Sequence, residues 1–370
     1  MNGRVIMLMS GGVDSSVAAA LLKEQGFDVY GVYILGWTGT AEFPCSWQQE
    51  EADARQVAEQ LNIPFQTVNL SKEYEKAVVD EFFAGYRRGV TPNPDILCNR
   101  EIKFKALWRA VRQLEPDYIA TGHYARIDNG RILKGRDANK DQSYFLWGIA
   151  AEMLPRILFP IGDLDKPVVR ALAKTYQLPT ATKKDSQGIC FIGPLKVRQF
   201  IASKLRPTPG EAILKDGRVI GQHQGVQLYT IGQRLGAGVV DWTGDVPPLF
   251  VLAKDIKNNR LIVGTDAETY SDKLVATSPN WLAQVELPIQ LSVKTRYRQS
   301  DVGATVAPGA DGSLEVRLSE PVRALTAGQS IVFYQGETLL GGAVIETVPA
   351  EQLLIEMTNG DKKDGGVERS

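Results

Sequence analysis

Residues 10–16 read Ser10-Gly11-Gly12-Val13-Asp14-Ser15-Ser16, and this stretch decides the fold of the first half of the chain. The apolar run at 5–9 predicts a buried parallel strand, and the periodicity of 14–25 predicts a helix that Gly26 closes. The glycines therefore lie in a strand-to-helix turn, where backbone N–H groups and a helix N-terminus meet an anion. The pattern predicts a phosphate-binding turn, since a side chain there would keep a phosphate at a distance. An ordinary turn capped by Asp14 is the alternative.

The turn differs from the Gly-x-x-x-x-Gly-Lys-Ser/Thr loop that grips the β- and γ-phosphates of a nucleotide. It resembles the pyrophosphate loop of enzymes that cleave ATP at the α-phosphate. That resemblance implies ATP as a substrate and AMP and pyrophosphate as products.

The composition is that of an ordinary globular protein, with 44% hydrophobic and 23% charged residues among 370. The net charge of −1 gives no general attraction to nucleic acid, so RNA binding would depend on local basic patches. No segment is apolar enough over sufficient length to span a membrane, and the early core strand argues against a cleaved signal peptide. We therefore expect a cytoplasmic protein. Three cysteines, Cys45, Cys98 and Cys190, do not make a disulfide framework.

Strands and helices alternate through the first half of the chain, which predicts an α/β fold with a doubly wound parallel sheet. The predicted strands are 5–9, 29–34, 65–70 and 118–120, and the predicted helices are 14–25, 49–61, 73–88, 99–114 and 167–177. Residues 126–133 predict a hairpin with an Asn-Gly turn. Ligands of such a sheet bind at the carboxyl ends of its strands, which is where the glycine turn lies.

Short strands and Gly, Asp and Pro turns replace the helical pattern after about residue 205. We expect an ATP-pyrophosphatase domain over 1–203, a small β-rich domain over 204–272 and a C-terminal β-barrel over 273–358. The polar, glycine-rich tail over 359–370 predicts disorder.

Cys98 follows a stiff segment that contains two prolines, Thr91-Pro92-Asn93-Pro94-Asp95. Asn99 is a good helix N-cap, which predicts that Cys98 lies at a helix N-terminus, where the helix dipole and Arg100 favour the thiolate. Asp95 precedes Cys98 by three residues and could transfer a proton. A rigid turn with a buried cysteine is the alternative.

Cys190 lies between Gly188 and Gly193, which predicts a mobile loop, and Lys183 and Lys184 nearby would lower the pKa of its thiol. A surface loop whose cysteine packs inward is the alternative. Cys45 has no such surroundings, so we expect a structural role for it. An ATP-cleaving turn together with two activated thiols indicates sulfur transfer, in which one thiol carries a persulfide and a disulfide forms between the two.

Six motifs in this order resemble the bacterial tRNA-specific 2-thiouridylase family, over about residues 4–347. They are residues 10–16, Thr91-Pro-Asn-Pro-Asp-Ile-Leu-Cys-Asn99, Ala120-Thr-Gly-His-Tyr-Ala-Arg126, Lys140-Asp-Gln-Ser-Tyr-Phe-Leu146, Lys183-Lys-Asp-Ser-Gln-Gly-Ile-Cys-Phe-Ile-Gly193 and Val293-Lys-Thr-Arg-Tyr-Arg298. The resemblance implies ATP-dependent 2-thiolation of the wobble uridine of tRNA. It also implies a cysteine desulfurase or a sulfur-relay protein as the sulfur donor, and Mg²⁺ as a partner of ATP.

The resemblance further implies a role for individual residues. Cys98 would be the nucleophile, Cys190 the persulfide carrier and Asp95 the acid/base. The ATP-binding residues would be Leu8, Met9, Ser10, Gly11, Gly12, Val13, Asp14, Ser15, Ile34 and Gly122. Asn93, Pro94 and Asp95 would face the target base, and further tRNA contacts would come from His123, Lys140, Asp141, Gln142, Arg296, Tyr297 and Gln329.

Residues 34–37 depart from the family, because they read Ile34-Leu35-Gly36-Trp37 where the family often has Met-Lys-Asn-Trp. An apolar contact with adenine survives at Ile34. The alternation of Lys294 to Arg298 predicts a strand with one basic face, which would supply RNA contacts or simply face solvent. Two other functions stay open: an AMP-forming synthetase with a small substrate, and a non-catalytic RNA-binding protein.

Overall fold

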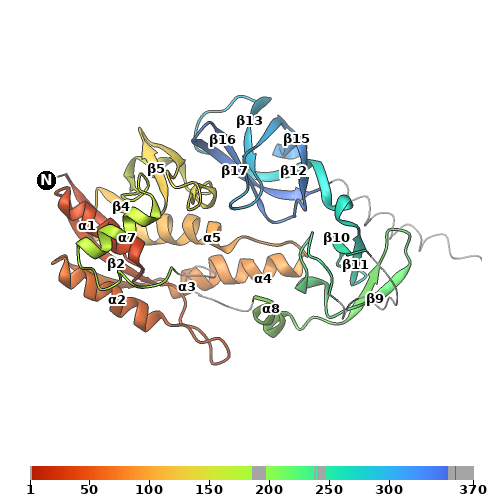
Figure 1. Ribbon diagram of the computed structural model, residues 1–370, viewed down its shortest axis with the longest axis horizontal. Coiled ribbons are helices and arrows are strands. Elements are labelled where there is room, and N and C mark those ends of the chain that lie inside the picture. The colour runs from red at the N-terminus through yellow and green to blue at the C-terminus, as the bar shows by residue number, and fades with distance from the viewer. Residues whose placement is uncertain (1, 186–196, 237–238, 240–246, 349–354, 356–370) are drawn as a thin grey trace, which may run out of the picture.

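The computed structural model describes residues 2–185, 197–236, 239, 247–348 and 355 of the chain. Three sheets organise it: a parallel sheet in the first half, a small sheet in the middle and a barrel near the C-terminal end (Figure 1). The α/β class and the β-rich second half are confirmed.

The first sheet has the order β3-β2-β1-β4-β7, and all of its pairings are parallel. Its strands are β1 (Arg4–Leu8), β2 (Asp28–Leu35), β3 (Phe65–Asn69), β4 (Tyr118–Ala120) and β7 (Ile157–Leu158). The chain winds outward from β1 in both directions, through β2 on one side and β4 on the other. The carboxyl end of β1 is therefore the switch point, where open α/β sheets bind ligands.

Alternate residues of β1 enter two different cores because successive side chains of a strand point to opposite faces. Val5 and Met7 pack with the helices α1 (Val13–Glu24), α2 (Trp47–Gln60) and α7 (Lys166–Thr175). Ile6 and Leu8 pack against the opposite layer, which holds the helices over 71–87 and 94–110. Helices cover both faces, which confirms the doubly wound arrangement.

The opposite layer contains two long helical stretches that change pitch along their length. One runs through α3 (Ser71–Tyr74), the π-helical η1 (Glu75–Val79) and α4 (Asp80–Arg87). The other runs through α5 (Pro94–Leu97), the π-helical η2 (Cys98–Ala106) and α6 (Leu107–Ala110). Short 3₁₀ turns lie elsewhere in the described chain: η3 (Arg112–Leu114), η4 (Ser143–Phe145), η5 (Ala151–Arg156), η6 (Val226–Leu228), η7 (Asp266–Thr269) and η8 (Ala310–Gly312).

The middle part begins after α8 (Val197–Leu205) and forms a four-stranded sheet of order β10-β11-β8-β9. Its strands are β8 (Gly210–Ile213), β9 (Val219–His223), β10 (Phe250–Asp255) and β11 (Arg260–Gly264). A separate small core that includes Val226, Ile231 and Val251 lies under this sheet.

The third part is a six-stranded antiparallel barrel that closes through a pairing of β12 with β17. It consists of β12 (Tyr270–Trp281), β13 (Ile289–Lys294), β14 (Val302–Pro308), β15 (Leu314–Arg323), β16 (Ser330–Gln335) and β17 (Thr338–Thr347). The predicted hairpin is present as β5 (Ala125–Asp128) and β6 (Arg131–Lys134), yet it continues the sheet of the barrel, through Leu133 opposite Thr338. None of the helices in the described part of the chain could cross a membrane.

Candidate functional site

The predicted phosphate turn connects β1 to α1 and approaches two neighbouring segments so closely that only glycine fits. Gly11 has φ of +69°, and a Cβ atom there would lie 2.2 Å from the carbonyl oxygen of Glu50. A Cβ atom on Gly122, which follows β4, would lie 2.8 Å from the backbone nitrogen of Ser15. The end of β4 therefore packs directly on the first turn of α1, which places Gly122 beside the turn.

Side chains inside the turn fix its shape without covering the helix N-terminus. Ser15 accepts a hydrogen bond from the backbone N–H of Ser10 (3.2 Å), and Ser16 donates to the carbonyl of Gly12 (2.8 Å). The N-cap residue of α1 is Gly12, and no side chain of the described residues caps that end. The first N–H groups of α1 are thus left for an external anion.

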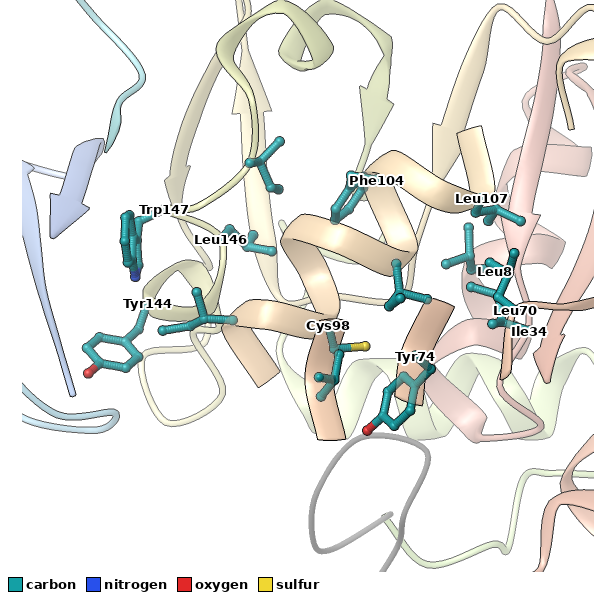
Figure 2. Close-up of a cluster of buried hydrophobic side chains, with 14 of the residues drawn as sticks. Leu8, Ile34, Leu70, Tyr74, Cys98, Phe104, Leu107, Tyr144, Leu146 and Trp147 are labelled. Carbon is teal, nitrogen blue, oxygen red and sulfur yellow. The ribbon is translucent and has the colours of Figure 1, made fainter. Parts of the chain in front are cut away.

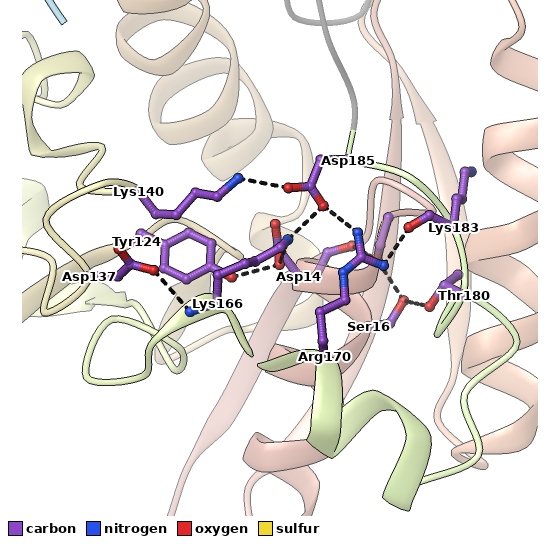
Figure 3. A network of polar contacts seen from close by, with 12 residues as sticks. Asp14, Ser16, Tyr124, Asp137, Lys140, Lys166, Arg170, Thr180, Lys183 and Asp185 are labelled. Atoms are coloured by element: carbon purple, nitrogen blue, oxygen red, sulfur yellow. Dashed lines mark hydrogen bonds and ion pairs between the residues drawn. The ribbon is translucent and has the colours of Figure 1, made fainter. Parts of the chain in front are cut away.

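Asp14 faces a tyrosine and a lysine that come from distant parts of the sequence (Figure 3). Its Oδ1 atom accepts hydrogen bonds from the hydroxyl of Tyr124 (2.9 Å) and from Nζ of Lys166 (2.6 Å). Burial, the charge of Asp14 and this hydrogen bond raise the pKa of Tyr124, so its hydroxyl stays a donor. Asp14 does not cap the helix; it joins α1 to the start of α7.

Asp185 brings three cations together next to Asp14. Its carboxylate binds Nζ of Lys140 (2.7 Å), Nζ of Lys166 (2.8 Å) and the guanidinium of Arg170. Burial raises the pKa of Asp185, but the hydrogen bonds from Lys140 and Lys166 outweigh it, and the net pKa lies well below its usual value. Three cations around one carboxylate, beside a phosphate turn, form a cluster with a net positive charge that would attract a polyanion.

Cys98 is buried and occupies a different position from the predicted one. The helix begins at Pro94 and its N-cap is Asn93, whose side chain accepts from the N–H groups of Asp95 and Ile96. Asn99 is not an N-cap, because it lies inside the helix and donates to the carbonyl of Phe145 (2.9 Å). Cys98 therefore lies in the second turn, where the effect of the helix dipole on the thiol is weaker than predicted.

Cys98 shares a buried cluster with some of the residues that the sequence predicted to bind ATP. Cys98 belongs to the same buried cluster as Leu8 at the end of β1, Ile34 in β2 and Tyr74. Its sulfur points toward the side of the cluster where these residues lie (Figure 2). Met9 packs on the other face of the sheet. Asp95 precedes Cys98 by almost one helical turn, so both lie on one face of the helix. Cys190 lies outside the described residues.

His123 sits between a lysine and a threonine, which fixes its tautomer. Nζ of Lys103 can only donate, so Nε2 of His123 accepts (3.4 Å) and Nδ1 donates to the hydroxyl of Thr121 (2.7 Å). Burial and the charge of Lys103 lower the pKa of His123 well below its usual value. The imidazole is neutral, so a contact of His123 with RNA would be stacking or a hydrogen bond and not an ion pair.

We expect His123→Gln to reduce the acid sensitivity of folding. Because the pKa of His123 is lowered in the folded state, the unfolded chain binds the proton first as the pH falls below about 6.5, and stability decreases. The slope from this residue is at most about 1.4 kcal/mol per pH unit. Urea denaturation at pH 7.0 and 5.5 measures it. His223, the second histidine of the chain, also has a pKa lowered by burial. His223→Gln therefore serves as the comparison, because it should also reduce the acid sensitivity of folding. An unchanged pH dependence in His123→Gln contradicts the expectation.

The predicted RNA contacts at 140–142 are occupied by intramolecular bonds. Lys140 binds Asp185, and the carboxylate of Asp141 accepts from the N–H groups of Gly135 (3.0 Å) and Ser143 (3.1 Å). Gln142 accepts from the N–H group of Tyr124 (2.9 Å). Asp141 and Gln142 thus hold this loop in place.

The predicted basic strand at 294–298 is wrong, because β13 ends at Lys294 and the chain then turns, with Arg298 at φ of +65°. The guanidinium of Arg296 donates to the carbonyl of Ala324 (2.6 Å). Tyr297 packs on Phe145, with 4.6 Å between the ring centroids. In a strand, the side chains of Arg296 and Tyr297 would point to opposite faces. In this turn they need not do so.

Sequence reasoning missed Lys166, Arg170 and Tyr124, and gave Asp185 no role. One signal for Lys166 was available. It is the first residue of α7, where the helix dipole disfavours a cation, so a lysine there needs a partner. Its partners, Asp14 and Asp185, become visible only in the folded chain.

Comparison with known proteins gives a consistent result over most of the chain. Family models described as the tRNA methyl transferase HUP domain, the tRNA methyl transferase PRC-barrel domain and the aminomethyltransferase beta-barrel domain match residues 3–194, 198–265 and 271–345. A tRNA-specific 2-thiouridylase MnmA of Listeria monocytogenes is 47% identical over 355 residues, which cover 93% of this chain and 95% of the relative. The protein of that name from Shouchella clausii is 45% identical over 358 residues, or 94% and 98% of the two chains.

Among solved structures, the U34-tRNA thiolase NcsA of Methanococcus maripaludis matches with 18% identity and a TM-score of 0.35. The match covers 55% of this chain and 65% of that one. This likeness is too weak to support a conclusion about function.

Proposed function

Because this chain belongs to the tRNA-specific 2-thiouridylase family, we propose that it is an ATP-dependent sulfurtransferase that converts the wobble uridine of a tRNA to 2-thiouridine. The full-length relatives support this activity more strongly than the domain descriptions do, since they match all three parts of the chain at once. The geometric observation that supports the proposal is that Cys98 belongs to the same buried cluster as Leu8 and Ile34, two of the residues expected to hold ATP.

ATP would bind with its phosphates at the turn of residues 10–15. The N–H groups at the start of α1 would bind phosphate oxygens, and Lys166 would neutralise the charge that develops as pyrophosphate leaves. The O2 atom of the uridine would attack the α-phosphate, which forms an O2-adenylate and releases pyrophosphate. The adenylate turns a poor leaving oxygen into a good one.

Mg²⁺ is compatible with this turn but stays a prediction. Within the described residues no three His, Cys, Asp or Glu side chains gather as a metal site. Mg²⁺ commonly needs only one or two carboxylates together with substrate phosphates, and Asp14 is the carboxylate at the turn. Asp14 would hold the ion, which would supply further neutralisation of phosphate charge.

The sulfur would come from a persulfide on Cys190, which a cysteine desulfurase or a sulfur-relay protein loads. In one route the thiolate of Cys98 attacks the inner sulfur of that persulfide, so that a Cys98–Cys190 disulfide forms and hydrosulfide attacks C2 of the uridine. In the other route the terminal sulfur attacks C2 first, and Cys98 then forms the disulfide. Either route releases AMP, and Asp95 would transfer the protons. The protein would act in the cytoplasm.

Nucleoside mass spectrometry tests the proposal. The full chain is incubated with tRNA, ATP and a persulfide donor, and the tRNA is then digested. The expected result is 2-thiouridine at the wobble position together with an equal amount of AMP. AMP formation that needs no RNA would indicate a synthetase with a small substrate, and tRNA binding without ATP binding would indicate a non-catalytic protein. Either result contradicts the proposal.

A further inference from the structure

The carboxylate of Asp185 connects cations from two predicted binding sites (Figure 3). Its Oδ1 atom binds Nζ of Lys166 (2.8 Å) and the guanidinium of Arg170. Lys166 also pairs with Asp14 at the phosphate turn (2.6 Å), which places this side of the carboxylate next to the expected phosphates of ATP. The Oδ2 atom binds Nζ of Lys140 (2.7 Å), where a contact with tRNA is expected. One carboxylate therefore engages cations on the ATP side and on the tRNA side of the site.

The segment that ends at Asp185 lies directly against the phosphate turn. The hydroxyl of Thr180 donates to the hydroxyl of Ser16 (3.0 Å), and Nζ of Lys183 donates to the carbonyl of Gly11 (2.9 Å). A triphosphate that binds at the turn would therefore come close to the carboxylate of Asp185, and like charges repel each other. The phosphates and this carboxylate cannot both hold the same cations.

The charges and the exposure of these side chains favour an exchange of anions. Burial raises the pKa of Asp185, but the hydrogen bonds from Lys140 and Lys166 outweigh it, so Asp185 is an anion at neutral pH. Phosphate presents the same kind of oxygen acceptor to lysine and arginine as a carboxylate does. The side chain of Asp185 is 33% exposed and can move into water, whereas Lys166 is 12% exposed and needs an anionic partner where it lies. A phosphate could thus replace Asp185 on these cations.

We propose that Asp185 holds these cations in place of the two substrates, and that ATP and tRNA each displace it. Phosphates of ATP would bind Lys166 and Arg170, and a phosphate of tRNA would bind Lys140. Because both ligands must release the same carboxylate, the first to bind removes a cost that the second would otherwise bear. ATP and tRNA therefore bind with positive cooperativity, which favours the complex that holds both. This inference rests on the proposed function, because it takes tRNA as the ligand of Lys140.

Asp185→Asn tests this coupling, because the amide keeps the shape of the side chain and removes its charge. The Kd values of a non-hydrolysable ATP analogue and of tRNA are measured on the full chain, each alone and with the other ligand present. In the wild type we expect each ligand to lower the Kd of the other about tenfold. In Asp185→Asn each ligand alone should bind about tenfold more tightly, and the second ligand should then change its Kd by less than about twofold.

Asp163→Asn is the matched control, since it removes the same charge from a carboxylate that is 78% exposed and lies 3.9 Å from the guanidinium of Arg126. This variant should keep the Kd values and the coupling of the wild type. The inference is overturned if the wild type shows no coupling, or if Asp185→Asn keeps it or binds either ligand more weakly. A loss of ATP affinity in Asp185→Asn that occurs with Mg²⁺ and disappears in EDTA would make Asp185 a metal ligand, which also overturns it.

These binding measurements need no sulfur donor and no turnover, so they separate the inference from the proposed function. A wild type that shows the coupling but makes no 2-thiouridine contradicts the proposed function and leaves the role of Asp185 standing. A wild type that makes 2-thiouridine without any coupling contradicts the role of Asp185 alone.

Discussion

We expect Asp14→Ala to lower AMP formation by at least roughly 100-fold while the fold stays intact. Asp14 lies at the turn where phosphates are expected and orients Lys166 through a 2.6 Å ion pair. Its side chain is 31% exposed, so its loss leaves no cavity in a core. Chromatographic measurement of AMP with tRNA and a sulfur donor present gives the rate, and circular dichroism checks the fold.

Lys166→Met distinguishes the two roles that Asp14 can have. If Asp14 acts by positioning Lys166, both variants lose activity to a similar extent and the double variant loses little more. If Asp14 acts through the metal ion, the double variant is far worse than either single one. Asp163→Ala is the control, since this aspartate of the same part of the chain is 78% exposed. Normal AMP formation by Asp14→Ala contradicts the assignment of the turn.

We expect Cys98→Ser and Cys190→Ser each to abolish the thiolation of tRNA, but at different steps. Cys190→Ser should accept no sulfur from the donor, whereas Cys98→Ser should accept sulfur on Cys190 and then fail to transfer it. Both variants should still bind ATP and tRNA, because neither residue belongs to the glycine turn or to the predicted tRNA contacts. Peptide mapping locates the persulfide, and nucleoside mass spectrometry measures the product.

The wild type should hold a Cys98–Cys190 disulfide after one turnover without reductant, which requires the two Cα atoms to come within about 7 Å. Cys98 is fully buried in this structure, so a disulfide at this position would itself be buried. Cys45→Ser is the control and should behave like the wild type. A persulfide on Cys45 or Cys98, or normal thiolation by Cys190→Ser, contradicts the mechanism.

The elements that the sequence predicted correctly depend on local pattern. An apolar strand, a glycine turn and an amphipathic helix define residues 4–24, and the Asn129–Gly130 turn defines its hairpin, since both residues adopt positive φ. The helix start near Cys98 was wrong although a local signal was present. Pro94 at the first helical position, preceded by Asn93 as N-cap, is a stronger start signal than Asn99.

Other features depend on contacts between residues far apart in the chain. Lys166 meets Asp14 across 152 positions, and the hairpin of the first part joins the sheet of the barrel. Thr91, Gln233 and Arg296, which come from three separate parts of the chain, line one pocket. The sequence by itself determined the phosphate turn, the alternation of the first sheet and the two kinds of architecture, because backbone preference and hydrophobic period are local properties. Only the tertiary structure decided which charges face that turn and where the three parts meet, because those contacts follow from how complete elements pack.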